Sequence, residues 1–184
     1  MITENRMIMI GATGRNSGKT SLATEIIKSL KHKKKIIGLK ITTIGSREAV
    51  CPRGGEGCGV CTSVDGDYDI LKENGCGTDK DTVRLLDAGC ESVYWIRTHK
   101  EHIVEAFEEF LKLAADADLI VCESNSLRHY VKPYLFIMIK NTSDEFIKPT
   151  AAAVLEYADH VVPKYDILES KGFTKRLIND LDRS

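Results

Sequence analysis

The chain has 184 residues, of which 26 are basic and 27 acidic, and its formal net charge at pH 7 is -1. This length suits a single domain with a core of its own, which we expect over residues 1–184. A chain so close to neutral has no broad attraction to nucleic acid or to an anionic membrane, so we expect neither as a partner.

The hydrophobic pattern alternates between strands and helices along the chain. Residues 6–11 (RMIMIG) form a short apolar run typical of a buried strand, residues 21–34 have apolar side chains at helical spacing, and residues 35–42 return to strand. Further helices are expected at 79–89, 102–117, 149–158 and 167–181, and further strands at 92–98, 118–124, 134–140 and 160–163.

This alternation predicts the fold class. Strands separated by helices indicate βαβ crossovers and a mainly parallel sheet. The strands are continuous apolar runs, which suit a sheet covered by helices on both faces. We therefore expect an α/β protein built as a three-layer α/β/α sandwich.

A phosphate-binding loop is indicated between the first strand and the first helix. The sequence GATGRNSGKTS at 11–21 contains the Gly-Lys-Thr of the G-x-x-x-x-G-K-[ST] motif, with Thr13 in place of the first glycine. Gly18 would let the backbone approach a phosphate, Lys19 would reach the β- and γ-phosphates, and the Thr20 hydroxyl would bind Mg²⁺. The alternative is a glycine-rich turn with a surface lysine. The expected nucleotide-binding residues of the loop are Gly14, Arg15, Asn16, Ser17, Gly18, Lys19, Thr20 and Ser21.

Two charged residues end strands that should meet at the same edge of the sheet. Glu123 ends the strand at 118–124, where a carboxylate could hold Mg²⁺ or orient an attacking water; a capping or surface glutamate is the alternative. Lys40 ends the strand at 35–42 and could contact phosphate or a bound pterin, or simply be solvated. We take Lys19 and Glu123 as the candidate catalytic residues.

A polar segment, Asn-Thr-Ser-Asp at 141–144, follows the strand at 134–140. Asn141 and Asp144 have the spacing of the guanine-binding N-x-x-D of GTPases, although Thr142 replaces the lysine found there. The alternative is an ordinary polar turn. The segment favours GTP over ATP as the nucleotide without deciding between them.

Residues 43–78 show no clear periodicity and hold four of the six cysteines, so we expect an insertion at about 45–77. Cys58 and Cys61 have the C-x-x-C spacing of a shared metal ion. With Cys51 and Cys76 they could bind Zn²⁺ or an iron–sulfur cluster, or remain reduced thiols. Cys90 and Cys122 are expected in the core.

Several segments together resemble one family of P-loop NTPases. GRNSGKTSL, IGLKIT and DLIVCES are similar, in order, to motifs of MobB, the molybdopterin-guanine dinucleotide biosynthesis protein B family. DKDTVRLLDAGCESV at 79–93 is similar to that family's G-K-D-[ST]-x-R-x-x-x-A-G-A-x-x-V, and KPTAAAVLEYADHVV at 148–162 also fits. The resemblance covers most of the chain outside residues 43–78, and it gives Asp81 and Arg84 a place in the site.

The resemblance implies slow GTP or ATP hydrolysis in support of molybdenum cofactor nucleotide chemistry. Molybdopterin, a partner nucleotidyl-transferase and a homodimer are implied with it. Two alternatives remain: an NTP-driven metallochaperone that uses the cysteines, and a small-molecule kinase or ligase. Arg6 is followed by only four apolar residues, too few for a signal-peptide core, so we expect a cytoplasmic protein.

Overall fold

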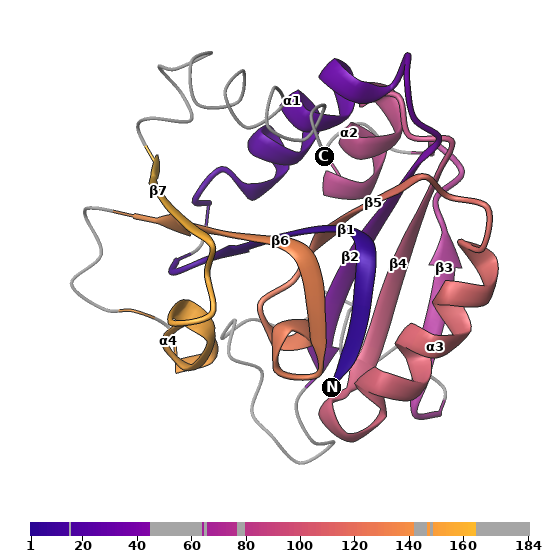
Figure 1. Ribbon diagram of the computed structural model, residues 1–184. Coiled ribbons are helices and arrows are strands. Elements are labelled where there is room, and N and C mark those ends of the chain that lie inside the picture. Colours follow the sequence, from indigo (N-terminus) through magenta and orange to yellow (C-terminus); the bar gives the residue numbers. More distant parts are fainter. Residues whose placement is uncertain are drawn as a thin grey trace.

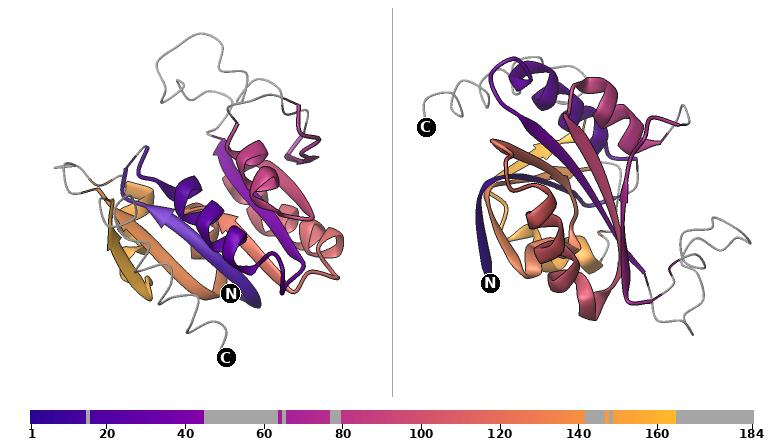
Figure 2. Two further views of the ribbon diagram at one scale, coloured as in Figure 1. Left: turned by 90° about the horizontal axis from the view of Figure 1, so that it is seen from above. Right: turned by 90° about the vertical axis from the view of Figure 1, so that its right-hand side faces the viewer.

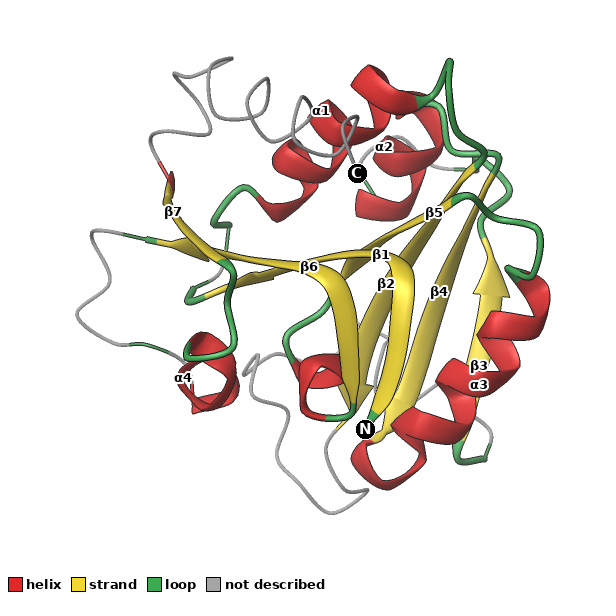
Figure 3. Ribbon diagram, viewed as in Figure 1, coloured by secondary structure: helices red, strands yellow, loops and turns green. Residues whose placement is uncertain are grey.

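The computed structural model describes residues 1–14, 16–44, 64, 66–76, 80–141, 147 and 149–164, which form one sheet with helices on both faces (Figures 1 and 3). The strands are β1 (Ile2–Ala12), β2 (Ile36–Ile44), β3 (Tyr68–Lys72), β4 (Ser92–His99), β5 (Leu119–Glu123), β6 (Val131–Lys140) and β7 (His160–Pro163). The helices are α1 (Lys19–Leu30), α2 (Asp81–Ala88), α3 (Ile103–Leu113) and α4 (Pro149–Leu155), with 3₁₀ turns η1 (Lys100–His102) and η2 (Ser126–His129).

The sheet has the strand order β3-β4-β2-β5-β1-β6-β7, and all neighbouring pairs are parallel except β3 and β4. Helices α1 and α2 cover one face, and α3 and α4 cover the other (Figure 2). The expected three-layer α/β/α sandwich with a mainly parallel sheet is confirmed. No helix within the described residues is long and apolar enough to cross a bilayer.

The central strands are buried on both faces. Met7, Ile8, Met9 and Ile10 of β1 have no exposed surface, and alternate residues belong to opposite cores. Met7 and Met9 pack into the core on the α3 side, while Ile8 and Ile10 pack into the core on the α1 side. This two-sided burial is why β1 reads as a continuous apolar run rather than an alternating one.

The two cysteines expected in the core are there. Cys122 belongs to the core under α3, and Cys90 to the core under α1. Burial raises the pKa of both thiols, to about 12 for Cys90, so neither forms a reactive thiolate near neutral pH.

Strand β3 was not expected from the sequence. It lies at the edge of the sheet, where its side chains are half-buried or exposed and leave no clear apolar pattern. Arg97 of the antiparallel neighbour β4 fixes its place: Nε donates to Asp69 Oδ1 at 2.9 Å, and Nη2 forms an ion pair with the other oxygen. Tyr68 and Ile70 pack against the core under α3, and the polar cross-strand pair adds to this contact.

Helix boundaries also differ from the expected ones. Helix α1 starts two residues earlier than expected and ends at Leu30, and α3 ends at Leu113 rather than at 117. Gly89 ends α2 as expected. The expected helix at 167–181 lies outside the described residues, and so does position 79, where the helix at 79–89 was expected to begin.

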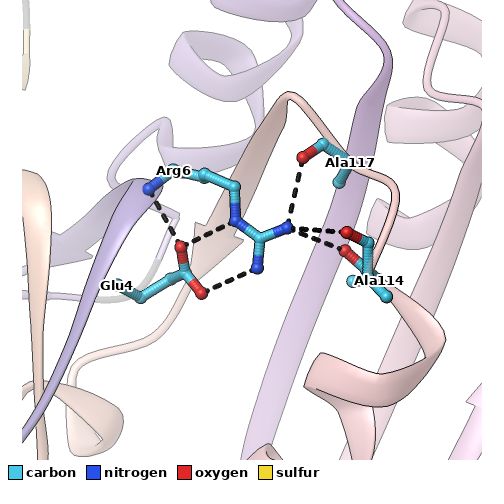
Figure 4. Close-up of polar contacts among 5 residues, drawn as sticks. Glu4, Arg6, Ala114 and Ala117 are labelled. Carbon is cyan, nitrogen blue, oxygen red and sulfur yellow. Dashed lines mark hydrogen bonds and ion pairs between the residues drawn. The ribbon is translucent and has the colours of Figure 1, made fainter.

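Arg6 ties the bend of β1 to the end of α3 (Figure 4). Its Nε and Nη2 donate to the two carboxylate oxygens of Glu4, both at 3.0 Å, and Nη1 donates to the carbonyls of Ala114, Ala115 and Ala117 at 3.1 to 3.3 Å. Ala114 caps the C-terminus of α3, and Ala115 and Ala117 follow it, so Arg6 places its positive charge beside the partially negative end of this helix. Burial acts to raise the pKa of Glu4, but the hydrogen bonds and charge of Arg6 outweigh it, and this pKa lies below its ordinary value.

Candidate functional site

The loop between β1 and α1 leads the chain to the N-terminus of α1, which lies beside one small cavity. Gly18 has φ 90° and ends the loop in the left-handed region, where glycine is favoured. It gives α1 no side-chain cap, so the first N–H groups of the helix are left for a ligand. They border a cavity of about 260 Å³, lined by residues 16–21 with Asp81, Arg84 and Glu123. Such a helix end suits a phosphate.

The unusual glycine placement has a packing explanation. Thr13, which stands where the motif has glycine, is fully buried; its N–H donates to the Ile139 carbonyl at 2.9 Å, and its hydroxyl accepts the Asn141 N–H at 3.1 Å. The threonine thus joins the ends of β1 and β6. Gly11, in turn, leaves room for Asn125, since a Cβ at position 11 would lie 2.7 Å from Asn125 Oδ1.

Strand register places the two charged strand ends together. Glu123 of β5 is the register partner of Ile10 in β1 on one side and of Lys40 in β2 on the other. Lys40 forms an ion pair with Asp81, the first residue of α2. Four charged groups from four elements, Lys19, Lys40, Asp81 and Glu123, therefore meet beside the loop.

Glu123 is buried without a complete set of partners. It is 3% exposed, and its Oε1 has no hydrogen-bond partner among the described residues. Burial raises the pKa of Glu123, and the charge of Asp81 adds to this, while Lys40 and Lys19 act in the opposite direction. An unpaired buried carboxylate oxygen is costly for folding, which indicates that it serves a ligand.

The surroundings act differently on the charged forms of Lys19 and Asp81, the neighbours of Glu123. Burial lowers the pKa of Lys19 and the charge of Lys40 adds to this, while Glu123 opposes it. Burial acts to raise the pKa of Asp81, but the hydrogen bond and charge of Lys40 outweigh it, and this pKa lies below its ordinary value. The site therefore keeps Asp81 ionised, while it destabilises the charges of Lys19 and Glu123 until a ligand arrives.

Comparison with known proteins shows the fold. No protein-family model and no curated protein sequence matches the chain. Among solved structures, it is similar to LpxK from Aquifex aeolicus, determined in complex with ATP, with 16% identity, a TM-score of 0.51 and coverage of 88% of this chain and 49% of LpxK. The chain has the P-loop NTPase fold. It spans about half the length of LpxK, and the narrower resemblance to MobB stays a prediction.

The oxygen atoms beside the P-loop suit Mg²⁺. The Thr20 side chain lies within hydrogen-bonding reach of both Asp81 and Glu123, and Glu123 Oε1 lacks a partner among the described residues. No cluster of three or more His, Cys, Asp or Glu residues in the described part of the chain could hold a metal alone. Mg²⁺ is usually held by one or two carboxylates together with phosphate and water, and Thr20, Asp81 and Glu123 supply oxygen atoms of this kind.

A second cavity of about 650 Å³ adjoins the P-loop. It shares Asn16, Lys19, Asp81 and Glu123 with the first cavity and continues along the carboxyl ends of β2 and β5. Its other described lining residues are Lys40, Ile41, Thr42, Thr43, Lys100, Ser124, Asn125, Ser126, His129, Tyr130 and Thr150.

Most of the site residues expected from the sequence lie in or beside the two cavities, and the others lie elsewhere or outside the described residues. Asn16, Ser17, Gly18, Lys19, Thr20, Ser21 and Glu123 line the smaller cavity, Lys40 lines the larger one, and Gly14 is buried in the loop. Asn141 follows β6, outside the described lining of both cavities. Cys76 is an exposed free thiol. Arg15, Asp144, Cys51, Cys58 and Cys61 lie outside the described residues.

Sequence reasoning undervalued several residues of the site. Asp81 and Arg84 were supported only by resemblance, yet both line the cavity beside the P-loop. Asn125 was not singled out, and its amide pairs with both backbone groups of Ala12 at 2.9 Å. The available signal was the polar sequence Ser-Asn-Ser at 124–126 directly after a buried strand, where parallel sheets place ligand-binding residues.

Proposed function

We propose that this protein binds a nucleoside triphosphate with Mg²⁺ at the P-loop and cleaves its terminal phosphate. The observation that carries the proposal is the partnerless buried Glu123 oxygen beside Lys19 and the N-terminus of α1. A positive helix end, a lysine and a carboxylate at one cavity match the needs of phosphoryl transfer, which relies on positioning and charge.

Each residue has a distinct part in this proposal. The N–H groups of α1 and the Lys19 ammonium bind the phosphate oxygens. Thr20, Asp81 and Glu123 would hold Mg²⁺, which supplies positive charge to the terminal phosphates. Arg84, whose Nη2 lies 3.5 Å from Ser21 Oγ, adds a further positive charge at the rim. Glu123 orients the attacking group.

The nucleotide base is proposed to be guanine, on the basis of Asn141 and Asp144. The Asn141 backbone is anchored by Thr13, which fixes the start of this segment next to the P-loop. Competition calorimetry with GTP and ATP tests this point. Tighter binding of GTP, weakened by Asp144→Asn, is expected, and equal affinities would leave the segment as a polar turn.

The biological role is proposed from the MobB resemblance, strongest at residues 79–93. In that role the protein would present nucleotide or molybdopterin to a nucleotidyl-transferase, as a homodimer. Molybdopterin should then shift the melting temperature of the nucleotide-bound protein. The metallochaperone alternative depends on the cysteines, and metal analysis of protein purified without chelator tests it. A kinase role is favoured by the second cavity.

Nucleotide binding is tested most simply with Lys19→Ala. At a nucleotide concentration of about 100 Kd, the wild type should gain roughly 2.7 kcal/mol of stability with Mg²⁺ present. Lys19→Ala should lose this gain and remain folded, since the lysine serves the ligand. Lys28→Ala, at an exposed position of the same helix, is the matched control and should keep it. An equal gain in Lys19→Ala and the control would refute the proposed P-loop site.

A further inference from the structure

The second cavity, called the wider cavity below, is far larger than the single water molecule that hydrolysis requires. A water molecule occupies about 30 Å³ in the liquid, whereas ligand pockets measure about 300–1,000 Å³. The wider cavity, at about 650 Å³, lies in the second range. Lys19 and Glu123 line both cavities, so the two join where the terminal phosphate would lie. A second small molecule could therefore approach that phosphate directly.

The charged side chains that line the wider cavity differ between its two ends. Its acidic groups, Asp81 and Glu123, lie at the P-loop end, where Lys40 and Lys19 also lie. Lys100 of η1, by contrast, has no ion-pair partner among the described residues, and His129 of η2 also borders the cavity. Lys100 therefore provides positive charge away from the P-loop, which suits an anionic group on the bound molecule, and the His129 ring offers a hydrogen-bonding group beside it.

Hydroxyl groups from two elements also face this cavity. Thr43 of β2 and Ser126 of η2 are joined by a hydrogen bond of 2.6 Å between their oxygens, and Ser126 Oγ lies 3.4 Å from Ser124 Oγ. Such hydroxyls both donate and accept, so they can bind the hydroxyl groups of a polar ligand. The lining thus fits a hydroxylated anion better than an apolar molecule.

We infer that the wider cavity binds a small hydroxylated anion and that Glu123 accepts the proton of its hydroxyl group during phosphoryl transfer. This inference rests on the proposed binding of a nucleoside triphosphate. It makes Glu123 Oε1 the proton acceptor and leaves the other carboxylate oxygen beside Thr20 for the cation.

The step balances without a further reactant. The hydroxyl oxygen of the anion forms a bond to the γ-phosphorus, and the bond from that phosphorus to the β,γ-bridging oxygen breaks. The nucleoside diphosphate leaves with the electron pair of that bond. The hydroxyl proton passes to Glu123 and then to solvent, so the products are a phosphorylated anion, a nucleoside diphosphate and a proton.

The test follows the transferred phosphate. The probe is ATP or GTP labelled at the γ-phosphate, whichever binds in calorimetry, with Mg²⁺ and a protein-free small-molecule cell extract. One half of the extract is first passed over an anion-exchange resin. We expect a labelled product other than inorganic phosphate with the untreated extract, and none with the resin-treated extract.

Three variants assign the roles. Glu123→Gln should slow transfer by about 10²- to 10⁴-fold and still bind nucleotide. Lys100→Gln should raise the extract concentration for half-maximal rate by about 10-fold with an unchanged maximal rate, as expected for one lost charged contact. Lys112→Gln, an exposed lysine of α3 that does not line the cavity, is the matched control and should change neither.

Four results separate the possible failures. If neither nucleotide binds, the proposed function itself is wrong, and this inference with it. If nucleotide binds but label appears only as inorganic phosphate, at the same rate with and without extract, the acceptor inference is overturned and nucleotide binding stands. Equal transfer with resin-treated extract, or equal behaviour of Lys100→Gln and Lys112→Gln, would overturn the assignment of an anionic acceptor.

Discussion

Two buried glutamates on neighbouring strands of the sheet have opposite surroundings. Glu4 in β1 is 8% exposed, and Glu123 in β5 is 3% exposed. Arg6 donates to both carboxylate oxygens of Glu4 (Figure 4), whereas Glu123 Oε1 has no partner among the described residues. Burial acts to raise both pKa values. Arg6 outweighs this effect at Glu4, whose pKa lies below the ordinary value, whereas the pKa of Glu123 lies above it.

This difference indicates that the Glu4 carboxylate stabilises the fold, whereas the Glu123 carboxylate serves to bind a ligand. Both carboxylate oxygens of Glu4 accept hydrogen bonds from Arg6, which also donates to three carbonyl groups after the end of α3. Glu123 is buried to a similar extent, but its Oε1 has no hydrogen-bond partner among the described residues, and it lies beside the N-terminus of α1. Burial alone thus identifies neither role; the state of the hydrogen-bond partners does.

The largest expected effect comes from replacing each glutamate by glutamine. Glu123→Gln should slow nucleotide turnover by about 10²- to 10⁴-fold, because it removes the proton acceptor and a cation ligand. The free energy of unfolding should stay the same or rise, since the substitution removes a buried carboxylate whose Oε1 has no hydrogen-bond partner among the described residues. Steady-state turnover and chemical denaturation measure the two effects.

Glu4→Gln is the opposite case and serves as the control. It should lower the free energy of unfolding by about 1–3 kcal/mol, through weaker hydrogen bonds with Arg6, and leave turnover unchanged. A large stability loss in Glu123→Gln without a turnover defect would remove the functional distinction between the two residues.

A smaller effect is expected in the pH dependence of stability. A depressed pKa, as at Glu4, stabilises the fold above the unfolded value near 4.5, and this is lost as pH falls through the folded pKa. A raised pKa, as at Glu123, has the opposite sign: its contribution is complete below the unfolded value and is lost as pH rises through the folded pKa.

Denaturation from acidic to neutral pH checks these signs. The stability advantage of the wild type over Glu4→Gln should shrink as pH falls. The stability advantage of Glu123→Gln over the wild type should grow as pH rises. Parallel stability curves for the two variants would contradict the assigned pKa directions.

The smallest expected effect is that of Thr13→Gly, which restores the usual glycine of the motif. It removes the hydroxyl that accepts the Asn141 N–H and should lower stability by about 1 kcal/mol. Nucleotide affinity should change only a few-fold, because Thr13 joins strands and does not line the smaller cavity within the described residues. Calorimetry with Mg²⁺ and nucleotide checks this, and a large affinity gain would show that the threonine obstructs the phosphate.

The sequence predicted the layers of this fold because its strands are apolar on both faces. The run Met7–Ile10 and the strand ending at Glu123 could be identified without a structure, and so could the P-loop. Strand β3 could not, since it is a short edge strand in which Tyr68 and Ile70 pack against the core while the neighbouring apolar Leu71 is exposed.

The candidate site was only partly predictable, for a geometric reason. Glu123 and Lys19 follow from their places at a strand end and a helix start. The ion pair of Lys40 with Asp81 joins residues 41 positions apart, which local pattern cannot reveal. The partnerless oxygen of Glu123 likewise depends on the packing of neighbouring strands, and only coordinates show it.

The central claim is that Glu123 lacks a complete set of hydrogen-bond partners among the described residues because it serves a ligand, whereas Arg6 pairs with both carboxylate oxygens of Glu4. Carboxyl ¹³C NMR titration of labelled glutamates, assigned with the Glu123→Gln and Glu4→Gln variants, tests it directly. We predict a pKa above the ordinary value for Glu123 that falls when Mg²⁺ and a non-hydrolysable nucleotide are added, and a low pKa for Glu4 that does not move. A Glu123 pKa that starts low, or that stays unchanged when the ligands bind, would contradict the account.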